Sequence, residues 1–318
     1  METGQKQVTK ETIKGFAKMT LDFSFKRVFG NETDKSALKA FIERMIGDVQ
    51  LSDVTLLPTE RLGLTCIDRK TVFDVSCRTN DGTEFIVEMQ CAKQKYFRDR
   101  ALYYAGHPVV EQGKKALEKF VSANNGDTDK KEFRWDFNLK PVIFIAILNY
   151  VMEHNETWPQ DRYHSSYRIR EDTFHEPMND KLRFIFLELG RFDKDLNELH
   201  DINDKWMYAL KHMHEFHSRP EELNENEFDS LFNLAKIANF APDEMNSYLD
   251  ELVMDNDYWN TIDYAKEEAM KEGHEEGWKK GQEEGWKKGR EETIRKLLAA
   301  GIDKKMLAEA LDIDPEDL

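Results

Sequence analysis

The sequence predicts an α/β fold in which a mixed sheet is flanked by helices and followed by an α-helical region and a long C-terminal helical tail. Strand-like apolar runs lie between residues 71 and 189, helical patterns lie before and among them, and a glycine-spaced repeat follows. We therefore expect a core over residues 1–195, a helical region over 196–264 packed on that core, and a tail over 265–318.

Two helices are expected near the N-terminus. Residues 21–31 (LDFSFKRVFGN) place apolar side chains at near-helical spacing and end at a glycine. Residues 33–46 show the same spacing, with Thr33 or Asp34 as the N-cap and Gly47 as the C-terminal stop. These two segments precede the first predicted strands.

Residues 71–90 predict a β-hairpin. Apolar and polar residues alternate on both sides of Asn80-Asp81-Gly82, which is a strong turn signal. With the turn centred on Asp81, Asp74 lies opposite Glu88, because each is seven residues away from the centre. The same register gives the hairpin one apolar face and one mostly polar face.

The later segments alternate between helical and strand-like patterns. They predict a helix over 92–120 that is interrupted or kinked near residues 106–108, followed by a polar loop over 124–131. A strand over 141–150 (PVIFIAILNY) is expected to be buried on both faces, and a second strand is expected over 182–189. Helices are expected from about residue 195, with Trp206, Leu210 and Met213 on one stripe. Strands separated by helices indicate an α/β core followed by a helical region.

Composition indicates a folded protein inside the cell. The chain is 40% hydrophobic and 11% aromatic. Its first 18 residues lack the apolar centre of a signal peptide, and its longest apolar run, Val142 to Leu148, is too short to cross a bilayer. We therefore expect a cytoplasmic protein without a membrane partner. Its three cysteines, Cys66, Cys77 and Cys91, are expected to be reduced thiols, because their spacing fits neither a disulfide framework nor a zinc site.

The net charge of −16 is unevenly distributed along the chain. Residues 1–140 hold 24 basic and 21 acidic residues, which gives +3, and the remaining 22 basic and 41 acidic residues give −19. This distribution permits contact between DNA and the first half, although a strongly basic stripe is absent.

Asp74 and Glu88 are the residues whose placement predicts chemistry. Two carboxylates facing each other on a sheet repel, so the arrangement calls for a cation, a shared proton or separation. Mg²⁺ binds one or two carboxylates together with waters and a phosphate, and Gln90 on the same face is suited to hold a water or a phosphate oxygen. The set suits phosphodiester hydrolysis. The alternative is a pair of solvated acids on an exposed strand face.

The order of several motifs resembles the family of recombination-promoting nucleases and transposases within the PD-(D/E)XK nuclease superfamily. The resemblance is carried by LDFSFKRVFGNE, TVFDVSCRTNDGTEFIVEMQ, YFRDRALYYAGHPVVEQGKK, PVIFIAILNY, FIFLELGRF, DKWMYALKHM and the glycine-spaced tail. It covers nearly the whole chain. Each motif is degenerate, but their order and spacing together are specific.

The resemblance implies an active site made of an Asp on one strand and a Glu-x-Lys on the next. Asp74 matches the Asp and Glu88 matches the Glu, whereas Gln90 stands where the superfamily has Lys. That departure leaves the role of the lysine open, and Lys93 and Lys95 are the candidates to fill it from the following segment.

Two more residues enter through the resemblance. An acid on the first helix often assists the metal in this superfamily, which makes Asp22 the third candidate ligand, although a simple helix-start carboxylate is the alternative. Arg100 is similar to the family's helix arginine and is a candidate phosphate contact, with a surface ion pair as its alternative.

The resulting expectation is a DNA endonuclease that depends on Mg²⁺ or Mn²⁺ and acts in recombination or mobile-element biology. The second hypothesis is a catalytically weak protein with a nuclease fold that binds DNA or assembles with other chains, which the Gln90 departure keeps open. His212, His214 and His217 fit a solvated helix better than a metal cluster. Phosphate-loop and nucleophile-elbow motifs are missing from the sequence.

The tail contains an eight-residue repeat. HEEGWKKG at 274–281 recurs as QEEGWKKG at 282–289, and glycines fall at every fourth residue from Gly273 to Gly289. Pairs of Glu and Lys four residues apart favour a helix, although each interior glycine costs about 1 kcal/mol relative to alanine. A helix with a glycine stripe for close helix packing is the favoured interpretation, and a flexible glycine-rich linker is the alternative.

Two short helices should end the chain. Ile294, Leu297 and Leu298 form one stripe, Gly301 and Asp303 mark a stop and an N-cap, and a second apolar stripe follows. Such a pair resembles a helix-turn-helix DNA reader. However, residues 291–318 hold four basic and eight acidic residues, so their net charge of −4 repels phosphate. We expect the tail to make protein contacts, above all with other copies of the same chain.

Overall fold

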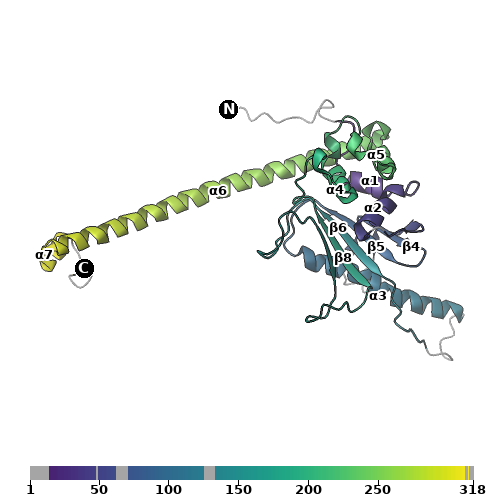
Figure 1. The fold of residues 1–318 in the computed structure, drawn as a ribbon, viewed down its shortest axis with the longest axis horizontal. Coiled ribbons are helices and arrows are strands. Elements are labelled where there is room, and N and C mark those ends of the chain that lie inside the picture. The colour runs from purple at the N-terminus through teal and green to yellow at the C-terminus, as the bar shows by residue number, and fades with distance from the viewer. Residues whose placement is uncertain (1–13, 48, 62–70, 125–132, 312–313, 315–318) are drawn as a thin grey trace. The chain divides into compact units, whose positions relative to one another are not determined.

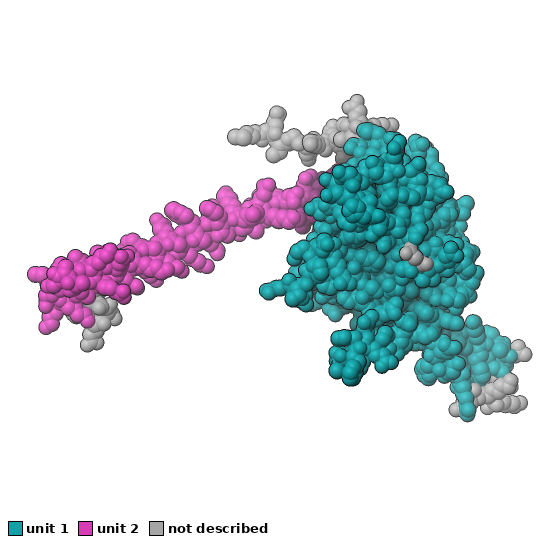
Figure 2. Space-filling view, viewed as in Figure 1, with its two compact units in different colours: residues 1–253 teal, residues 254–318 magenta. Residues whose placement is uncertain are grey.

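The computed structural model describes residues 14–47, 49–61, 71–124, 133–311 and 314. The chain divides into two compact units, residues 1–253 and 254–318, which are coloured separately in Figure 2. The domain boundaries expected at 195 and 264 stay predictions. Cys66 and most of the polar loop at 124–131 lie outside the described residues.

The first unit combines eight strands with helices on both sides (Figure 1). Its strands are β1 (Val54–Leu56), β2 (Glu60–Arg61), β3 (Thr71–Val72), β4 (Val75–Thr79), β5 (Glu84–Gln90), β6 (Val142–Leu148), β7 (His164–Arg168) and β8 (Leu182–Glu188). The α-helices are α1 (Asp22–Phe29), α2 (Ser36–Ile46), α3 (Phe97–Ala123), α4 (Ile202–His212), α5 (Asp229–Ala235), α6 (Pro242–Ala299), which continues into the second unit, and α7 (Lys304–Leu311) there.

Six strands form one mixed sheet in the order β1-β4-β5-β6-β8-β7. The central strands β5, β6 and β8 run parallel, whereas β1, β4 and β7 join antiparallel to their neighbours. Strands β2 and β3 form a separate two-stranded ribbon. The α/β fold with a mixed sheet is therefore confirmed, and the parallel strands bring the carboxyl ends of β5, β6 and β8 to one edge.

Helices cover both faces of this sheet. On one face, α1, α2, α4 and α5 form the larger apolar core, which includes Phe25, Phe41 and Trp206 (Figure 1). On the other face, α3 packs through Phe97, Ala101 and its neighbours on a smaller core. Strand β6 contributes alternate residues to both cores, so its predicted burial on two faces is confirmed.

The predicted hairpin register is confirmed. Val75 pairs with Val87 and Cys77 pairs with Phe85 between β4 and β5, as expected from a turn centred on Asp81. The second face is mostly polar, as predicted, but it is not exposed, because every residue of β5 is buried and α3 covers the side that carries Ile86. The predicted strand over 71–78 is also broken at Phe73 and Asp74, so Phe73 packs in the smaller core with Ile86.

Several helix predictions can be compared directly with the structure. Helix α1 spans residues 22–29 and α2 ends at Gly47, which has a left-handed φ of 107°, as expected. The N-cap of α2 is Lys35, which makes no side-chain cap, so neither Thr33 nor Asp34 holds that position. Helix α3 starts at Phe97 and continues through Pro108, so the start expected at residue 92 and the interruption were wrong.

The second unit consists of the larger part of α6, a turn and α7. The glycine repeat is helical, as the charge pairs predicted, and a Cβ at any of its five glycines meets no atom within 4 Å. Gly301 ends the turn with φ of 88°, and Asp303 accepts hydrogen bonds from the first amides of α7. Among the described residues, helices long and apolar enough to cross a bilayer are absent.

Candidate active site

Asp74 and Glu88 lie side by side at the junction of β4 and β5. The backbone N–H of Asp74 donates to Glu88 Oε1 at 3.2 Å, and the backbone N–H of Met89 donates to Asp74 Oδ2 at 2.8 Å. These reciprocal bonds follow from the hairpin register and from the break in the strand at Asp74. Each carboxylate is therefore held by the backbone of the opposite chain segment, and both belong to one site.

Burial and mutual repulsion make this pair hard to ionise. Glu88 is 1% exposed. Burial, followed by the charge of Asp74, raises the pKa of Glu88 well above its usual range. Burial also raises the pKa of Asp74, and the Met89 amide and nearby cations only partly oppose that effect. Without a bound cation, the two groups cannot both be ionised cheaply at neutral pH.

Gln90 and Arg100 surround the pair. Gln90 is buried on β5, two residues beyond Glu88, and its Nε2 lies 3.4 Å from Glu88 Oε2. Arg100, on the first turns of α3, lowers the pKa of both acids through its charge. Its guanidinium donates to Gln94 and lies over the ring of Tyr104 at 4.7 Å from the centroid. The charge of Arg100 on α3 thus acts on Asp74, which precedes β4, and on Glu88 of β5.

Asp22 and Lys26 bring a second charged pair from α1. The Lys26 ammonium lies 2.8 Å from Asp22 Oδ1 and 3.9 Å from Asp74 Oδ1. Burial lowers the pKa of Lys26, but the charges of Asp22, Asp74 and Glu88 outweigh burial and raise it. Sequence reasoning missed Lys26. The only available signal was its position one helical turn after Asp22, which places both side chains on one face.

A family model for PD-(D/E)XK nuclease family transposases matches residues 19–265. The chain belongs to this family. The match confirms the resemblance drawn from the motifs, spans the whole sheet and relates the chain to nucleases of mobile elements. Neither the curated proteins nor the solved structures contain a match.

The position of the superfamily lysine is held by Gln90, and the two lysines expected to replace it lie elsewhere. Lys93 pairs with the exposed carboxylate of Glu153 at 2.7 Å. Lys95 lies over the ring of Tyr96, 5.4 Å from its centroid. Neither contacts Asp74 or Glu88 among the interactions of the described chain. Lys26, in contrast, places its ammonium 3.9 Å from Asp74 Oδ1.

Asp22 does not complete a ligand cluster of three acids. Within the described ranges, groups of three or more His, Cys, Asp or Glu side chains arranged for a metal are absent. Asp22 starts α1, with its side chain 54% exposed, and shares the Lys26 ammonium with Asp74. Its charge nevertheless reaches the site, because it contributes to the raised pKa of Asp74.

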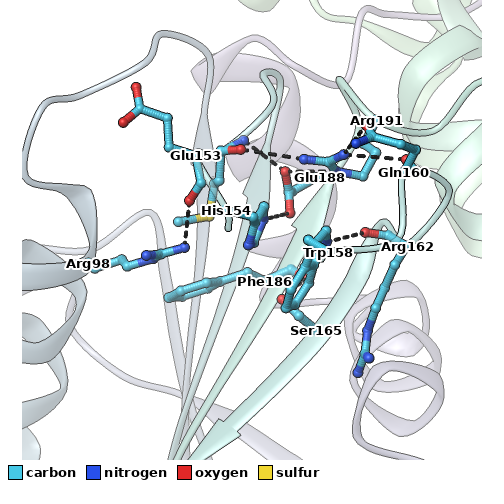
Figure 3. A network of polar contacts seen from close by, with 11 residues as sticks. Arg98, Glu153, His154, Trp158, Gln160, Arg162, Ser165, Phe186, Glu188 and Arg191 are labelled. Atoms are coloured by element: carbon cyan, nitrogen blue, oxygen red, sulfur yellow. Dashed lines mark hydrogen bonds and ion pairs between the residues drawn. The ribbon is translucent and has the colours of Figure 1, made fainter. Parts of the chain in front are cut away.

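A second buried carboxylate, Glu188, ends β8 at the same edge of the sheet (Figure 3). Its Oε1 lies 2.7 Å from His154 Nε2, and its Oε2 accepts the Met152 amide at 2.8 Å and approaches Arg191. The His154 ring stacks on Trp158 with centroids 3.9 Å apart. This network satisfies Glu188 internally and fixes the segment that follows β6, so Glu188 is structural.

The three histidines of α4 and its following turn do not form a metal site. His212 pairs with Glu215 at 2.9 Å. His214 is half-buried, and that burial lowers its pKa to about 4. The described chain contains no cluster of three ligands here, and these histidines are not part of the Asp74–Glu88 site.

Proposed function

We propose that this protein is a metal-dependent endonuclease that hydrolyses phosphodiester bonds in DNA. Asp74 and Glu88 serve as ligands of Mg²⁺ or Mn²⁺, and Gln90 orients a water or a phosphate oxygen beside them. The observation that carries the proposal is the adjacent carboxylate pair, half-buried at Asp74 and buried at Glu88, whose raised pKa values mean that ionising both groups is costly unless a cation binds between them. Membership in a family of nucleases supports the same reaction class.

The donor set fits a small divalent ion. Mg²⁺ prefers hard oxygen ligands, and proteins commonly supply one or two carboxylates and leave the other positions to water and phosphate. Asp74 and Glu88 meet that description, because they bring two carboxylates to one place. A bound divalent ion would lower the pKa of an attacking water and offset the charge of the phosphate.

The reaction expected here is a simple displacement at phosphorus. The oxygen of water bonds to phosphorus as the bond from phosphorus to the leaving sugar oxygen breaks. The water loses one proton, and the leaving oxygen gains one. Gln90 has both a carbonyl acceptor and an amide donor, so it can orient the water without itself changing its protonation state.

Cations near the acids provide the contacts to the DNA backbone. Arg100 is the candidate whose charge lowers the pKa of Glu88, and its planar guanidinium can donate to two phosphate oxygens at once. Lys93 and Lys95 follow β5 on the exposed segment before α3 and are expected to act at longer range. Binding that relies on such contacts weakens steeply as salt rises.

The alternative function is a catalytically weak DNA-binding or assembly protein with a nuclease fold. Gln90 favours it, because a neutral amide replaces the superfamily lysine at the reacting centre. The exposed tail adds to it: Trp278 and Trp286 are 64% and 65% exposed on the glycine-striped helix. Such side chains suit contact with another copy of the chain, and we include self-association through the tail in the proposal.

Plasmid cleavage by the purified full-length protein tests the function. We expect nicked and linear DNA with Mg²⁺ or Mn²⁺, none with a chelator, and a loss of at least about 100-fold in Asp74→Ala. His212→Ala serves as the control, because its surface ion pair with Glu215 is remote from the described chemistry. Equal cleavage by wild type and Asp74→Ala would refute the active-site assignment, and DNA binding without cleavage would favour the alternative.

A further inference from the structure

The Asp74–Glu88 site contains a cation that comes from a distant part of the sequence. Position 90, where the superfamily carries its lysine, holds a neutral amide. Lys26 of α1 places its ammonium 3.9 Å from Asp74 Oδ1 and senses the charge of Glu88 as well. A positive group is therefore present beside the acids, but it arrives on a helix instead of on β5.

We propose that Lys26 supplies the catalytic cation of this nuclease by contacting the phosphate group that reacts. This inference rests on the proposed function, because it assigns a role in the same hydrolysis. The Lys26 ammonium has three N–H donors, and Asp22 Oδ1 lies 2.8 Å from its nitrogen on one side. The remaining donors are available to a phosphate oxygen, whose negative charge increases as water adds to phosphorus.

Helix α1 holds this ammonium in place. Phe25 and Phe29 anchor the helix in the larger core. At its N-terminus, the amides of Asp22 and Phe23 donate to the Glu251 carboxylate at 2.8 and 2.7 Å. A helix fixed at its end and along one face restrains the Lys26 stem, which favours a catalytic contact because little ordering remains to be done in the transition state.

A simple surface ion pair is the competing explanation for Lys26. Lys39 and Glu43 on α2 form such a pair, also four residues apart, at 3.9 Å and with a similarly exposed lysine. Pairs of this kind contribute little to stability. Lys26 differs from Lys39 because a second carboxylate, that of Asp74 just before β4, lies 3.9 Å from its ammonium. Lys39 is therefore a matched control on another helix.

The first experiment compares Lys26→Met, Lys26→Arg and Lys39→Met in the full-length protein. Single-turnover cleavage with Mn²⁺ should fall by about 100-fold or more in Lys26→Met, as is typical when one positioned donor to the developing charge is lost. It should fall less in Lys26→Arg, which keeps the charge, and stay unchanged in Lys39→Met. Cleavage by Lys26→Met within threefold of wild type would overturn the inference.

Metal affinity separates catalysis from a structural role. Removing a cation beside two ligand carboxylates lessens repulsion of Mn²⁺, so Lys26→Met should bind Mn²⁺ about threefold or more tightly by titration calorimetry. If Lys26 only held the site together, Lys26→Met would weaken both metal binding and cleavage. Tighter metal binding with slower cleavage supports the inference, and weaker metal binding with slower cleavage contradicts it.

A relocated lysine gives a gain-of-function test. The Gln90 amide already reaches Glu88, so a lysine at position 90 can bring its ammonium to the same acids. We expect the double variant Lys26→Met/Gln90→Lys to cleave at least tenfold faster than Lys26→Met alone. No recovery, with metal affinity intact, would count against a shared role. If the wild-type protein shows no metal-dependent cleavage, the proposed function fails, and this inference fails with it. If the wild-type protein is active and Lys26→Met is equally active, only this inference is refuted.

Discussion

The Asp74–Glu88 pair is costly for the protein when it holds no cation. The two groups have pKa values raised first by burial, so their protonated forms are favoured in the folded state. The stability that these protonated groups contribute to the folded protein is present at low pH. It is lost as the pH rises through the pKa values that the groups have in the folded state. The metal-free fold therefore keeps a pair of carboxylates that destabilises it above neutral pH.

Glu88→Gln should stabilise the metal-free protein above neutral pH. The amide keeps an oxygen to accept the Asp74 N–H but removes one buried charge. Because the raised pKa means that Glu88 loses its proton only as pH rises past neutrality, the gain should be small at pH 5 and reach roughly 1–3 kcal/mol at pH 8.5. Urea unfolding in the presence of a chelator measures it.

Glu84→Gln provides the contrasting control for that measurement. Glu84 is also buried on β5, but it pairs with Arg78. Its replacement leaves Arg78 without a charged partner, so unfolding should require less urea at every pH above the acid range. Loss of stability in both variants at pH 8.5 would show that Glu88 is not repelled in the folded protein.

Mn²⁺ should protect wild type but not Asp74→Asn against heat. A ligand that binds only the folded state raises stability by mass action, about 2.7 kcal/mol at 100 times its dissociation constant. For a chain of this size we expect a rise of roughly 5 °C in melting temperature for wild type. The rise should shrink at low pH, because the acids must lose their protons to bind. Equal protection of Asp74→Asn would place the metal elsewhere.

At the level of single residues, the sequence could predict the acids but not their cation. Asp74 and Glu88 lie in one hairpin, and the Asn-Asp-Gly turn sets their register locally. Lys26 reaches them only because α1 packs across the sheet, and no local pattern specifies that approach. Lys93 and Lys95, which are near in sequence, contact Glu153 and Tyr96 instead, and their role toward DNA stays a prediction.

At the level of elements, close backbone packing holds the edge of the sheet near the site. Gly190 follows β8, and a Cβ there would lie 2.5 Å from the carbonyl carbon of Tyr150, just after β6. This contact places the ends of the two strands together. It also sets the position of the segment that the Glu188 network fixes.

Gly190→Ala should therefore destabilise the protein, by roughly 1–3 kcal/mol, because backbone rather than a flexible side chain must move. Gly106→Ala is its control. Gly106 lies inside α3 with no atom within 4 Å of a built Cβ, so the same change there should stabilise by about 1 kcal/mol. Chemical denaturation of both variants checks the opposite signs, and a neutral Gly190→Ala would mean that the strand ends separate freely.

The hairpin shows why elements are predicted better than their surroundings. Alternation along 71–90 identified both strands and their pairing. It could not reveal that α3 covers the second face, because Glu88 and Gln90 are polar residues of the kind that usually face solvent, yet both are buried. The edge strands β1 and β7 were missed, since three or five residues with mixed polarity carry little periodicity.

At the level of the whole molecule, acidic residues and large exposed side chains occur together in the C-terminal part of the chain. The acidic surplus lies after residue 140, and Met270, Trp278 and Trp286 are exposed in the second unit. The site residues lie in the first unit. An acidic tail with exposed aromatic side chains supports the proposal that it contacts protein instead of phosphate.

Deleting residues 266–318 should reduce the oligomer size in solution while leaving metal binding by one site intact. The reason is that the exposed tryptophans and the open glycine stripe are removed, whereas Asp74 and Glu88 are untouched. Sedimentation velocity and Mn²⁺ titration measure the two effects. Identical sedimentation of both chains, with weaker DNA binding by the shorter one, would instead make the tail a DNA-binding module.

The carboxylate of Glu251 caps the helix that carries Lys26, and Arg27 of that helix pairs with Glu244 at 3.0 Å. The first turns of α6 therefore support the helix that carries Lys26. The division of the chain after Val253 leaves Glu244 and Glu251 in the first unit. A chain shortened after Val253 keeps both supports of α1, whereas a chain shortened before Glu244 loses them.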